Sequence, residues 1–262
     1  MADIFDIEAL KRKRDLAALN KSYKDHFLLK YMSQNLAERF DSLGLEFDDI
    51  LLIGLMSDDL IKVLAQKANH KLAITDLSKK IIANYPELQS VNYQDETIQT
   101  QQQFDLIFSF LDLHHINKIP EHLSSIKKTL KPNGIFMGCF FGEENLKDLR
   151  QSFLANEASI TSPKFFPYIE IKTAGNMLQK AGFAEPITDL DRINIEYSKL
   201  KTLCKDIRDI GETNILRKRN DFLADRNFIQ KTESLLLSNN TKFNVEIQVI
   251  NFICYNKTRK PT

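Results

Sequence analysis

Short apolar runs alternate with segments of helical periodicity through the middle of this chain. Apolar residues dominate residues 50–55, 104–110 and 135–141, whereas residues 58–68 and 119–130 have the spacing of amphipathic helices. Strands that are apolar on both faces are typical of a parallel sheet that helices cover on both sides. Because the connections in such sheets are right-handed, we predict an α/β fold with a Rossmann-like, doubly wound, mostly parallel sheet.

The rest of the 262 residues extend this prediction. Four further segments have strand character and bring the expected sheet to seven strands: residues 72–75, 88–93, 193–197 and 243–255. Residues 6–43 have helical spacing, so we expect an N-terminal helical extension over residues 1–45. One domain would then span residues 46–262, with a helical insertion at about 199–240 before the last strand.

Charge and composition narrow the classes of function. The chain has 36 basic and 35 acidic residues, and a net charge of +1 gives no basic excess to neutralise nucleic-acid phosphates. No apolar run reaches the roughly 18–20 residues that a bilayer span needs. The acidic N-terminus has no signal-peptide pattern, and three scattered cysteines fit a reducing compartment. We therefore expect a cytoplasmic protein with no nucleic-acid partner and no membrane span.

A candidate ligand-binding turn follows the first apolar run. Gly54 lies in this turn, and Asp76 ends the next predicted strand 22 residues later. The spacing suits a nucleotide-type ligand, because a glycine lets the ligand approach the backbone and a carboxylate accepts hydrogen bonds from ribose hydroxyls. Asp76 could instead stabilise the dipole of the helix that follows it. The turn has one glycine where such loops carry two or three, since Met56 and Asp58 follow.

Nine segments, taken in order, carry a resemblance to a known family: Ile4–Asp6, Lys11–Asp15, Phe104–Ser109, Leu113–Pro120, Leu130–Phe136, Phe141–Arg150, Ser162–Tyr168, Leu178–Phe183 and Lys205–Asn214. Together they resemble class I S-adenosylmethionine-dependent methyltransferases of the type 11-like group. The similar branch contains the malonyl-acyl-carrier-protein methyltransferase of biotin synthesis and the mitochondrial complex I assembly factor 5. The chain departs from this family at Leu52, where the family has an acidic residue, and at Met56 and Asp58, where it has glycines.

The resemblance implies a site for S-adenosylmethionine at the carboxyl ends of the strands. The cofactor-binding residues that it implies are Gly54, Asp76, Asp95 and Glu96. His114 would face the methyl donor and the acceptor, where it could accept a proton or only line the pocket. The implied substrate or lid residues are Arg208, Glu212 and Asn214, although Arg208 and Glu212 could instead form a surface ion pair.

Two other features near these residues have simpler explanations. Asp112 and His114 are spaced like part of an iron site, but no third ligand is evident in the sequence, so we predict no metal ion. His115 stands where the family usually has an aromatic residue. The basic run Lys11–Arg14 on the first predicted helix has the character of a solvated face.

We therefore expect an enzyme that transfers a methyl group from S-adenosylmethionine to a small molecule or a protein side chain. Such an enzyme would act mainly by holding the donor and the acceptor in line. The alternative that the resemblance implies is a protein like the complex I assembly factor. It would be either an arginine hydroxylase or a non-catalytic partner that no longer binds the cofactor, with a subunit of respiratory complex I as its partner. In both cases we expect a bacterial cytoplasmic protein.

Overall fold

The computed structural model describes residues 3–20, 23–156, 165–219 and 226–257. Within these residues, seven strands form one sheet in the order β3-β2-β1-β6-β7-β9-β8. The strands are β1 (Phe47–Gly54), β2 (Ala68–Thr75), β3 (Gln89–Ser90), β6 (Phe104–Phe110), β7 (Leu130–Phe141), β8 (Ala184–Tyr197) and β9 (Phe243–Tyr255). Strands β3, β2, β1, β6 and β7 are parallel, and β9 runs antiparallel to both β7 and β8. The predicted seven-stranded, mostly parallel sheet is confirmed.

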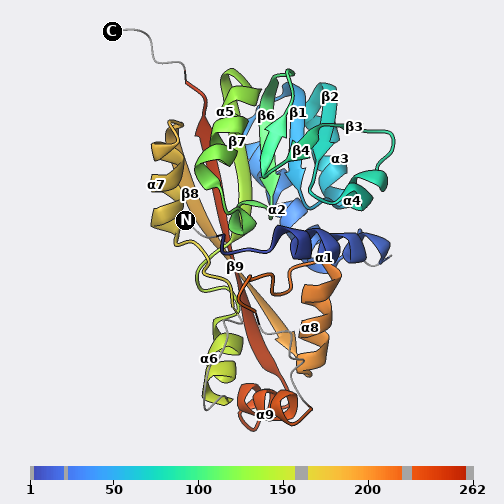
Figure 1. Ribbon diagram of the computed structural model, residues 1–262, viewed down its shortest axis with the longest axis vertical. Helices are drawn as coiled ribbons and strands as arrows, with labels where there is room; N and C mark the ends of the chain where they lie inside the picture. The colour runs from blue at the N-terminus through green and yellow to red at the C-terminus, as the bar shows by residue number, and fades with distance from the viewer. Residues whose placement is uncertain (1–2, 21–22, 157–164, 220–225, 258–262) are drawn as a thin grey trace.

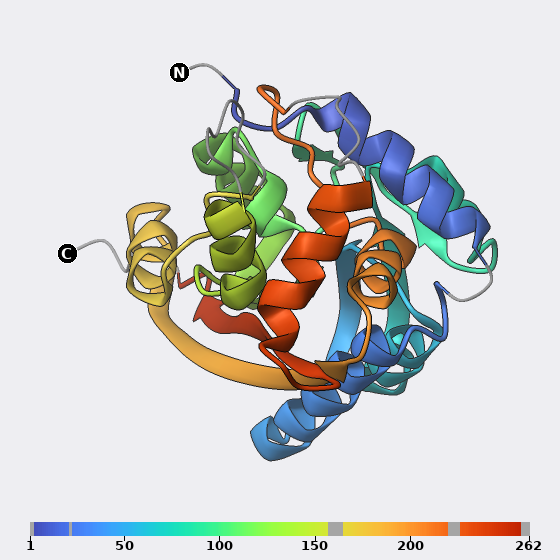
Figure 2. The ribbon, with the colours of Figure 1, turned by 90° about the horizontal axis from the view of Figure 1, so that it is seen from below.

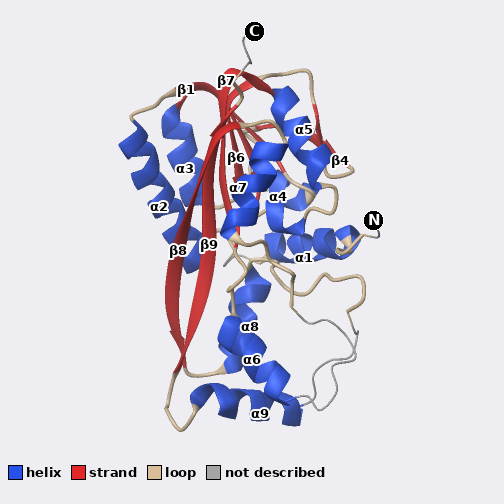
Figure 3. Cartoon of the chain, turned by 90° about the vertical axis from the view of Figure 1, so that its left-hand side faces the viewer, coloured by secondary structure: helices blue, strands red, loops and turns tan. Residues whose placement is uncertain are grey.

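Helices cover both faces of this sheet (Figure 3). They are α1 (Ile7–Leu19), α2 (Phe27–Leu43), α3 (Asp58–Lys67), α4 (Lys79–Ala83), α5 (Ile119–Thr129), α6 (Lys147–Asn156), α7 (Ile171–Lys180), α8 (Leu200–Asp209), α9 (Arg226–Leu237) and the 3₁₀ helix η1 (Leu113–His115). Helices α2, α3 and α4 pack on one face, and α5 and α7 pack on the other. The helices α8 and α9 lie between β8 and β9 in sequence, where the helical insertion was expected.

The strand pattern explains why both faces are buried. In β1, Ile50 and Leu52 belong to the cluster under α2 and α3, whereas Leu51 and Ile53 belong to the cluster under α5 and α7. All four side chains have no exposed surface. A strand with apolar residues at every position therefore lies between two layers of helices, as the sequence indicates.

The N-terminal segment contributes to the main core. The side chains of Tyr23, Leu29 and Phe40 are fully buried in the cluster that also contains Leu60 of α3. Helix α2 ends at Gly44, whose φ of 60° lets its N–H reach the carbonyls of the last turn. Residues 1–45 are therefore integrated by packing, and their boundary as a separate extension stays a prediction.

Two strands differ from the sequence-based expectation. Residues 88–93 were predicted as one strand, but β3 has only two residues and the chain continues into a separate hairpin of β4 (Asn92–Gln94) and β5 (Thr97–Gln99). Asp95 and Glu96 form the turn of this hairpin with positive φ values of 50° and 62°. Strand β8 starts well before residue 193, because it pairs with β9 from Ala184 onward.

The carboxyl edge of the parallel strands faces a lower group of helices (Figure 1). Strands β8 and β9 continue past this edge as a long ribbon, and α6, α8 and α9 lie beside its far end. Helix α1 lies across the edge, between the sheet and α8, and contacts α4 and α8. Among the residues that the structure describes, none of the helices combines the length and apolar character that a bilayer crossing requires.

Two glycine substitutions test the tight packing of the sheet. A Cβ at Gly138 of β7 would lie 2.2 Å from the Ser109 carbonyl oxygen, whereas a Cβ at Gly175 of α7 would meet only Thr188 at 3.8 Å. We expect Gly138→Ala to lower the free energy of unfolding by at least about 2 kcal/mol. Gly175→Ala should raise it by about 0.5–1 kcal/mol, because alanine favours a helix interior. Urea unfolding measures both, and equal effects would contradict the packing described.

Candidate functional site

The side chain of Arg14 occupies the carboxyl edge where the cofactor site was predicted. Its Nη1 donates to Asp76 Oδ2 at 2.6 Å and to Asp112 Oδ1 at 3.2 Å, and its Nη2 donates to the Leu111 carbonyl at 3.1 Å. The side chains of Arg14 and Asp76 are only 1% and 0% exposed. The other carboxylate oxygen of Asp76 accepts the Ser78 N–H at 2.5 Å. Both oxygens of the predicted ribose-binding group are thus bound by the protein itself.

Burial and pairing act in opposite directions on this ion pair. Burial alone would lower the pKa of Arg14, but the carboxylates of Asp76 and Asp112 raise it above its ordinary value. Burial raises the pKa of Asp76 to about 7, although Arg14 lowers it. The guanidinium is therefore a permanent cation beside two buried carboxyl groups. A buried charge of this kind is tolerated only when it is paired and hydrogen-bonded, and Arg14 meets both conditions.

The turn after β1 is packed against the protein as well. Gly54 has a φ of 96°, and a Cβ there would lie 2.4 Å from the Phe110 carbonyl oxygen. The close approach of β6 is therefore sufficient to explain the glycine at this position, with or without a ligand bound at the turn. The N–H of Met56 donates to the Tyr23 hydroxyl at 3.1 Å, and the Met56 side chain is fully buried in the main core.

The segment before α1 is fixed to the same edge. The Asn117 side-chain oxygen accepts the N–H groups of Ile4 and Phe5 at 2.8 and 2.9 Å. The N–H of Asp6 donates to the Ile215 carbonyl at 2.8 Å, in the segment that follows α8. Viewed from below, α1 lies at the edge of the sheet next to the chain that follows α8 (Figure 2). The N-terminal helix and the segment after α8 therefore form one cover over the strand ends.

The predicted adenine-binding acids Asp95 and Glu96 form the turn of the hairpin between β4 and β5. Asp95 is exposed. Glu96 is buried, and its carboxylate accepts the N–H groups of Asn117 and Lys118 at 2.8 and 3.1 Å. Glu96 therefore holds the start of α5 and, through Asn117, the N-terminal segment. A contact of Asp95 with adenine stays a prediction.

Two histidines and a glutamate meet beside this edge. His114 Nε2 lies 3.0 Å from Glu212 Oε2, and His115 Nε2 lies 3.2 Å from the same oxygen. The three side chains are 0%, 1% and 4% exposed. The predicted catalytic and lid residues His114 and Glu212 are therefore in contact although 98 residues separate them. His115 completes this group, whereas Asp112, which the sequence spaced with His114, binds Arg14 instead.

Burial and mutual contact act in opposite directions on the pKa values of this group. Burial alone would raise the pKa of Glu212, but His115 and His114 lower it below its ordinary value. Burial lowers the pKa of His115 to about 4, against the opposing effect of Glu212. At neutral pH Glu212 is therefore ionised and His115 is neutral.

The other predicted lid residues do not point into this group. Arg208 is exposed on α8, and among the described residues its predicted ion pair with Glu212 is absent, because the Glu212 carboxylate faces the histidines. The carbonyl of Asn214 accepts a hydrogen bond from Lys13 of α1, so this part of the segment helps to hold the cover. Substrate contacts of Arg208 and Asn214 stay predictions.

Sequence reasoning missed Arg14. The run Lys11–Arg14 was interpreted as a solvated face, but Arg14 is fully buried whereas Arg12 is exposed. The signal was present in the helical period, because Arg14 follows Leu10 by four residues and precedes Ala17 by three, and both are buried. A basic residue within the apolar stripe of a helix was therefore the sequence signal for a buried arginine at position 14.

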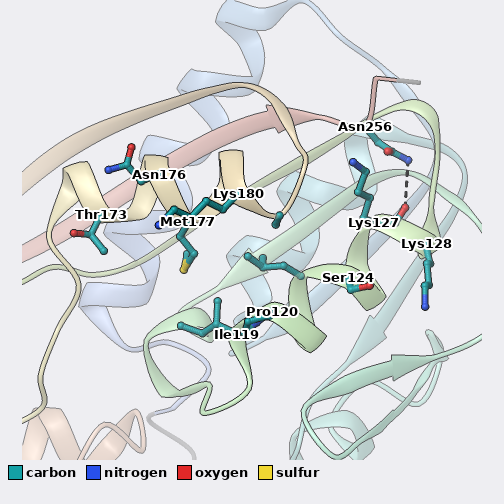
Figure 4. A pocket seen from close by; sticks show the side chains of 12 residues that line it. Ile119, Pro120, Ser124, Lys127, Lys128, Thr173, Asn176, Met177, Lys180 and Asn256 are labelled. Atoms are coloured by element: carbon teal, nitrogen blue, oxygen red, sulfur yellow. Dashed lines mark hydrogen bonds between the residues drawn. The ribbon is translucent and has the colours of Figure 1, made fainter. Parts of the chain in front are cut away.

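A large groove lies away from these residues. It has a volume of about 960 Å³ and lies between α5 and α7, where it is lined by side chains such as Pro120, Lys127 and Met177 (Figure 4). None of the predicted site residues lines it. The groove therefore belongs to the helical face of the sheet and not to the carboxyl edge.

Comparison with known proteins gives consistent matches. A family model described as a methyltransferase domain matches residues 24–185. The Rickettsia prowazekii protein RP459, which carries the name of a methyltransferase, is 33% identical over 74% of this chain and 85% of its own length. The mitochondrial arginine-hydroxylase NDUFAF5 of Danio rerio is 29% identical over 85% of this chain and 74% of its own. A Bacillus halodurans crystal structure described as a methyltransferase has a TM-score of 0.58 at 15% identity, over 86% of this chain and 100% of that one.

Removal of the Arg14 guanidinium tests the buried ion pair. Arg14→Met would leave Asp76 and Asp112 buried without their cation, and we expect the free energy of unfolding to fall by about 3–5 kcal/mol. The matched control is Arg192→Met, which removes an exposed ion pair with Glu246. This control should cost less than about 1 kcal/mol. Guanidinium chloride unfolding measures both, and an Arg14→Met effect as small as that of the control would show that the pair is not the clamp described.

Proposed function

Because this chain belongs to the S-adenosylmethionine-dependent methyltransferase family, we propose that it binds S-adenosylmethionine at the carboxyl edge of its sheet. The methyl group would pass to a small molecule or a protein side chain. The observation that carries the proposal is the position of Asp76 at the end of β2, where a carboxylate can accept both hydroxyls of a ribose. Methyl transfer from a sulfonium needs an in-line approach, so positioning supplies most of the rate.

In this proposal α1 acts as a gate over the cofactor site. Arg14 holds Asp76 in the structure, so the ribose has to displace the guanidinium before it can bind. The apparent affinity for the cofactor is then reduced by the fraction of molecules in which α1 has moved away. His114 keeps its predicted place near the acceptor, with its imidazole oriented by Glu212.

A second candidate is the modification of an arginine side chain in a partner protein. The specific observation in its favour is that the carboxyl edge already binds a guanidinium, through Asp76, Asp112 and the Leu111 carbonyl. A substrate arginine would replace Arg14 on the same three acceptors. The name of the Danio rerio relative, an arginine-hydroxylase of mitochondria, supports this candidate, and a respiratory complex I subunit is the partner that we propose for it.

The site of action in both proposals is the bacterial cytoplasm. The support is the bacterial relative from Rickettsia prowazekii, which matches most of the chain.

Calorimetry with S-adenosylmethionine and its demethylated product tests the gated site. We expect Arg14→Met to bind the cofactor at least about tenfold more tightly than the wild type, because the competing cation is gone. Asp76→Asn should lose binding. Arg12→Met, on the exposed side of the same helix, is the matched control and should bind like the wild type. If neither the wild type nor a folded Arg14→Met variant binds at millimolar cofactor, the methyltransferase proposal fails.

Mass spectrometry separates the two candidate functions. The wild-type protein is incubated with S-adenosylmethionine and an arginine-containing peptide from a complex I subunit. Methyl transfer predicts peptide that carries an added methyl group, whereas the second candidate predicts an added oxygen atom on arginine when a cell extract supplies oxygen and reductant. Asp112→Asn, which weakens the guanidinium site, should reduce either modification of arginine. An arginine peptide that stays unmodified under both conditions would remove the second candidate.

A further inference from the structure

We propose that His114, His115 and Glu212 form a binding site for a divalent first-row transition-metal ion. Their ligand atoms, two imidazole nitrogens and carboxylate oxygens, all lie within 4.8 Å of one another. This site goes beyond the proposed methyl transfer, which needs no metal ion. His114 would then act as a ligand rather than as a proton acceptor.

The spacing of the ligand atoms fits a single ion. Atoms that lie about 2.1 Å from a metal are separated from one another by about 3.0–3.4 Å in octahedral or tetrahedral sites. The distances from Glu212 Oε2 to the Nε2 atoms of His114 and His115 are 3.0 and 3.2 Å. Two histidines and one carboxylate leave further positions open, as in non-haem iron and catalytic zinc sites.

Hydrogen bonds within the protein do not satisfy this group. One oxygen, Glu212 Oε2, faces both imidazoles, while Glu212 Oε1 has no hydrogen-bond partner among the described residues. His115 Nε2 also makes no hydrogen bond among the described residues, although it lies 3.2 Å from Glu212 Oε2. Buried polar atoms without partners are uncommon and indicate a missing ligand or ion. A cavity of about 20 Å³ borders Glu212, which is enough for roughly one water-sized ligand.

Aromatic rings enclose the two histidines. The Phe141 ring lies 5.2 Å from the His114 ring, and the Phe166 ring lies 5.3 Å from the His115 ring. Phe5, from the segment before α1, packs edge-on against His115 at 6.1 Å. An apolar shell of this kind fixes the orientation of the ligands and controls the access of solvent to a metal. The cover formed by the N-terminal segment therefore closes the metal site as well.

Metal titration of chelator-treated, tag-free protein tests the site. Zn²⁺ or anaerobic Fe²⁺ should raise the Tm of the wild type by on the order of 5 °C, and Co²⁺ should give a visible absorption band. Mg²⁺, which prefers oxygen ligands, should do neither. Glu212→Gln and His115→Gln should each lose at least about 100-fold in affinity. The control is His70→Gln, which alters an exposed histidine beside Asp49 and should bind metal like the wild type.

The proposal is overturned if the folded wild type gives neither a Tm shift nor a Co²⁺ band at millimolar metal. It is also overturned if both Glu212→Gln and His115→Gln keep wild-type affinity. Circular dichroism checks that each variant is folded. If Glu212→Gln unfolds, the metal affinity of His115→Gln and the Co²⁺ spectrum of the wild type test the proposal instead. Cofactor binding is measured separately on metal-free protein, so failure of the metal site and failure of the methyltransferase proposal are distinguishable.

Discussion

The buried ion pair between Arg14 and Asp76 fixes the arrangement of the carboxyl edge. It connects α1 to the end of β2, and the further bonds of Arg14 to Asp112 and the Leu111 carbonyl connect it to the end of β6. A charge with no exposure to water is stable only with such a set of acceptors. Once α1 is held in this way, Phe5 lies against His115 and the segment after α8 can pack on the helix. The cover over the strand ends therefore depends on this contact together with the hydrogen bonds of Asn117 and Asp6.

In the proposed function the same carboxylates would serve two purposes that exclude each other in time. Asp76 and Asp112 hold α1 closed, and they are also the groups at the end of the strands that a ribose or a substrate guanidinium would use. A ligand for this site therefore competes with the structure of the protein itself. The free energy needed to displace the Arg14 side chain from these carboxylates determines the affinity that a ligand must have to open the site. A carboxyl edge that the protein itself occupies is consistent with membership of a cofactor-binding family if α1 opens as a gate.

The sheet was predictable because continuous apolar strands report burial on both faces. The strand boundaries that were predicted wrongly lie where the pattern of apolar residues is weak. In β8, Ile187 is 61% exposed, so the apolar residues do not mark a buried face there and the pairing with β9 decides where the strand begins. In residues 88–93, the chain leaves the sheet after Ser90, and the positive φ values at Asp95 and Glu96 fold the next residues back into a separate hairpin. Strand pairing and turn conformation are properties of the fold that local composition does not specify.

The positions of Gly54 and Asp76 in the fold followed from the sequence, but the contacts of the candidate site did not. Spacing alone placed Gly54 and Asp76 at the carboxyl edge, because strand ends follow from the strands. It could not pair Arg14 with Asp76 or Glu212 with His114, since 62 and 98 residues separate these partners. The pairing changes the chemistry: Asp76 becomes half of an ion pair, and Glu212 joins the two histidines in the group that we propose as a metal site. The role of Asp76 at its strand end therefore depends on the side chain that faces it. In this chain that side chain is Arg14, from the N-terminal helix.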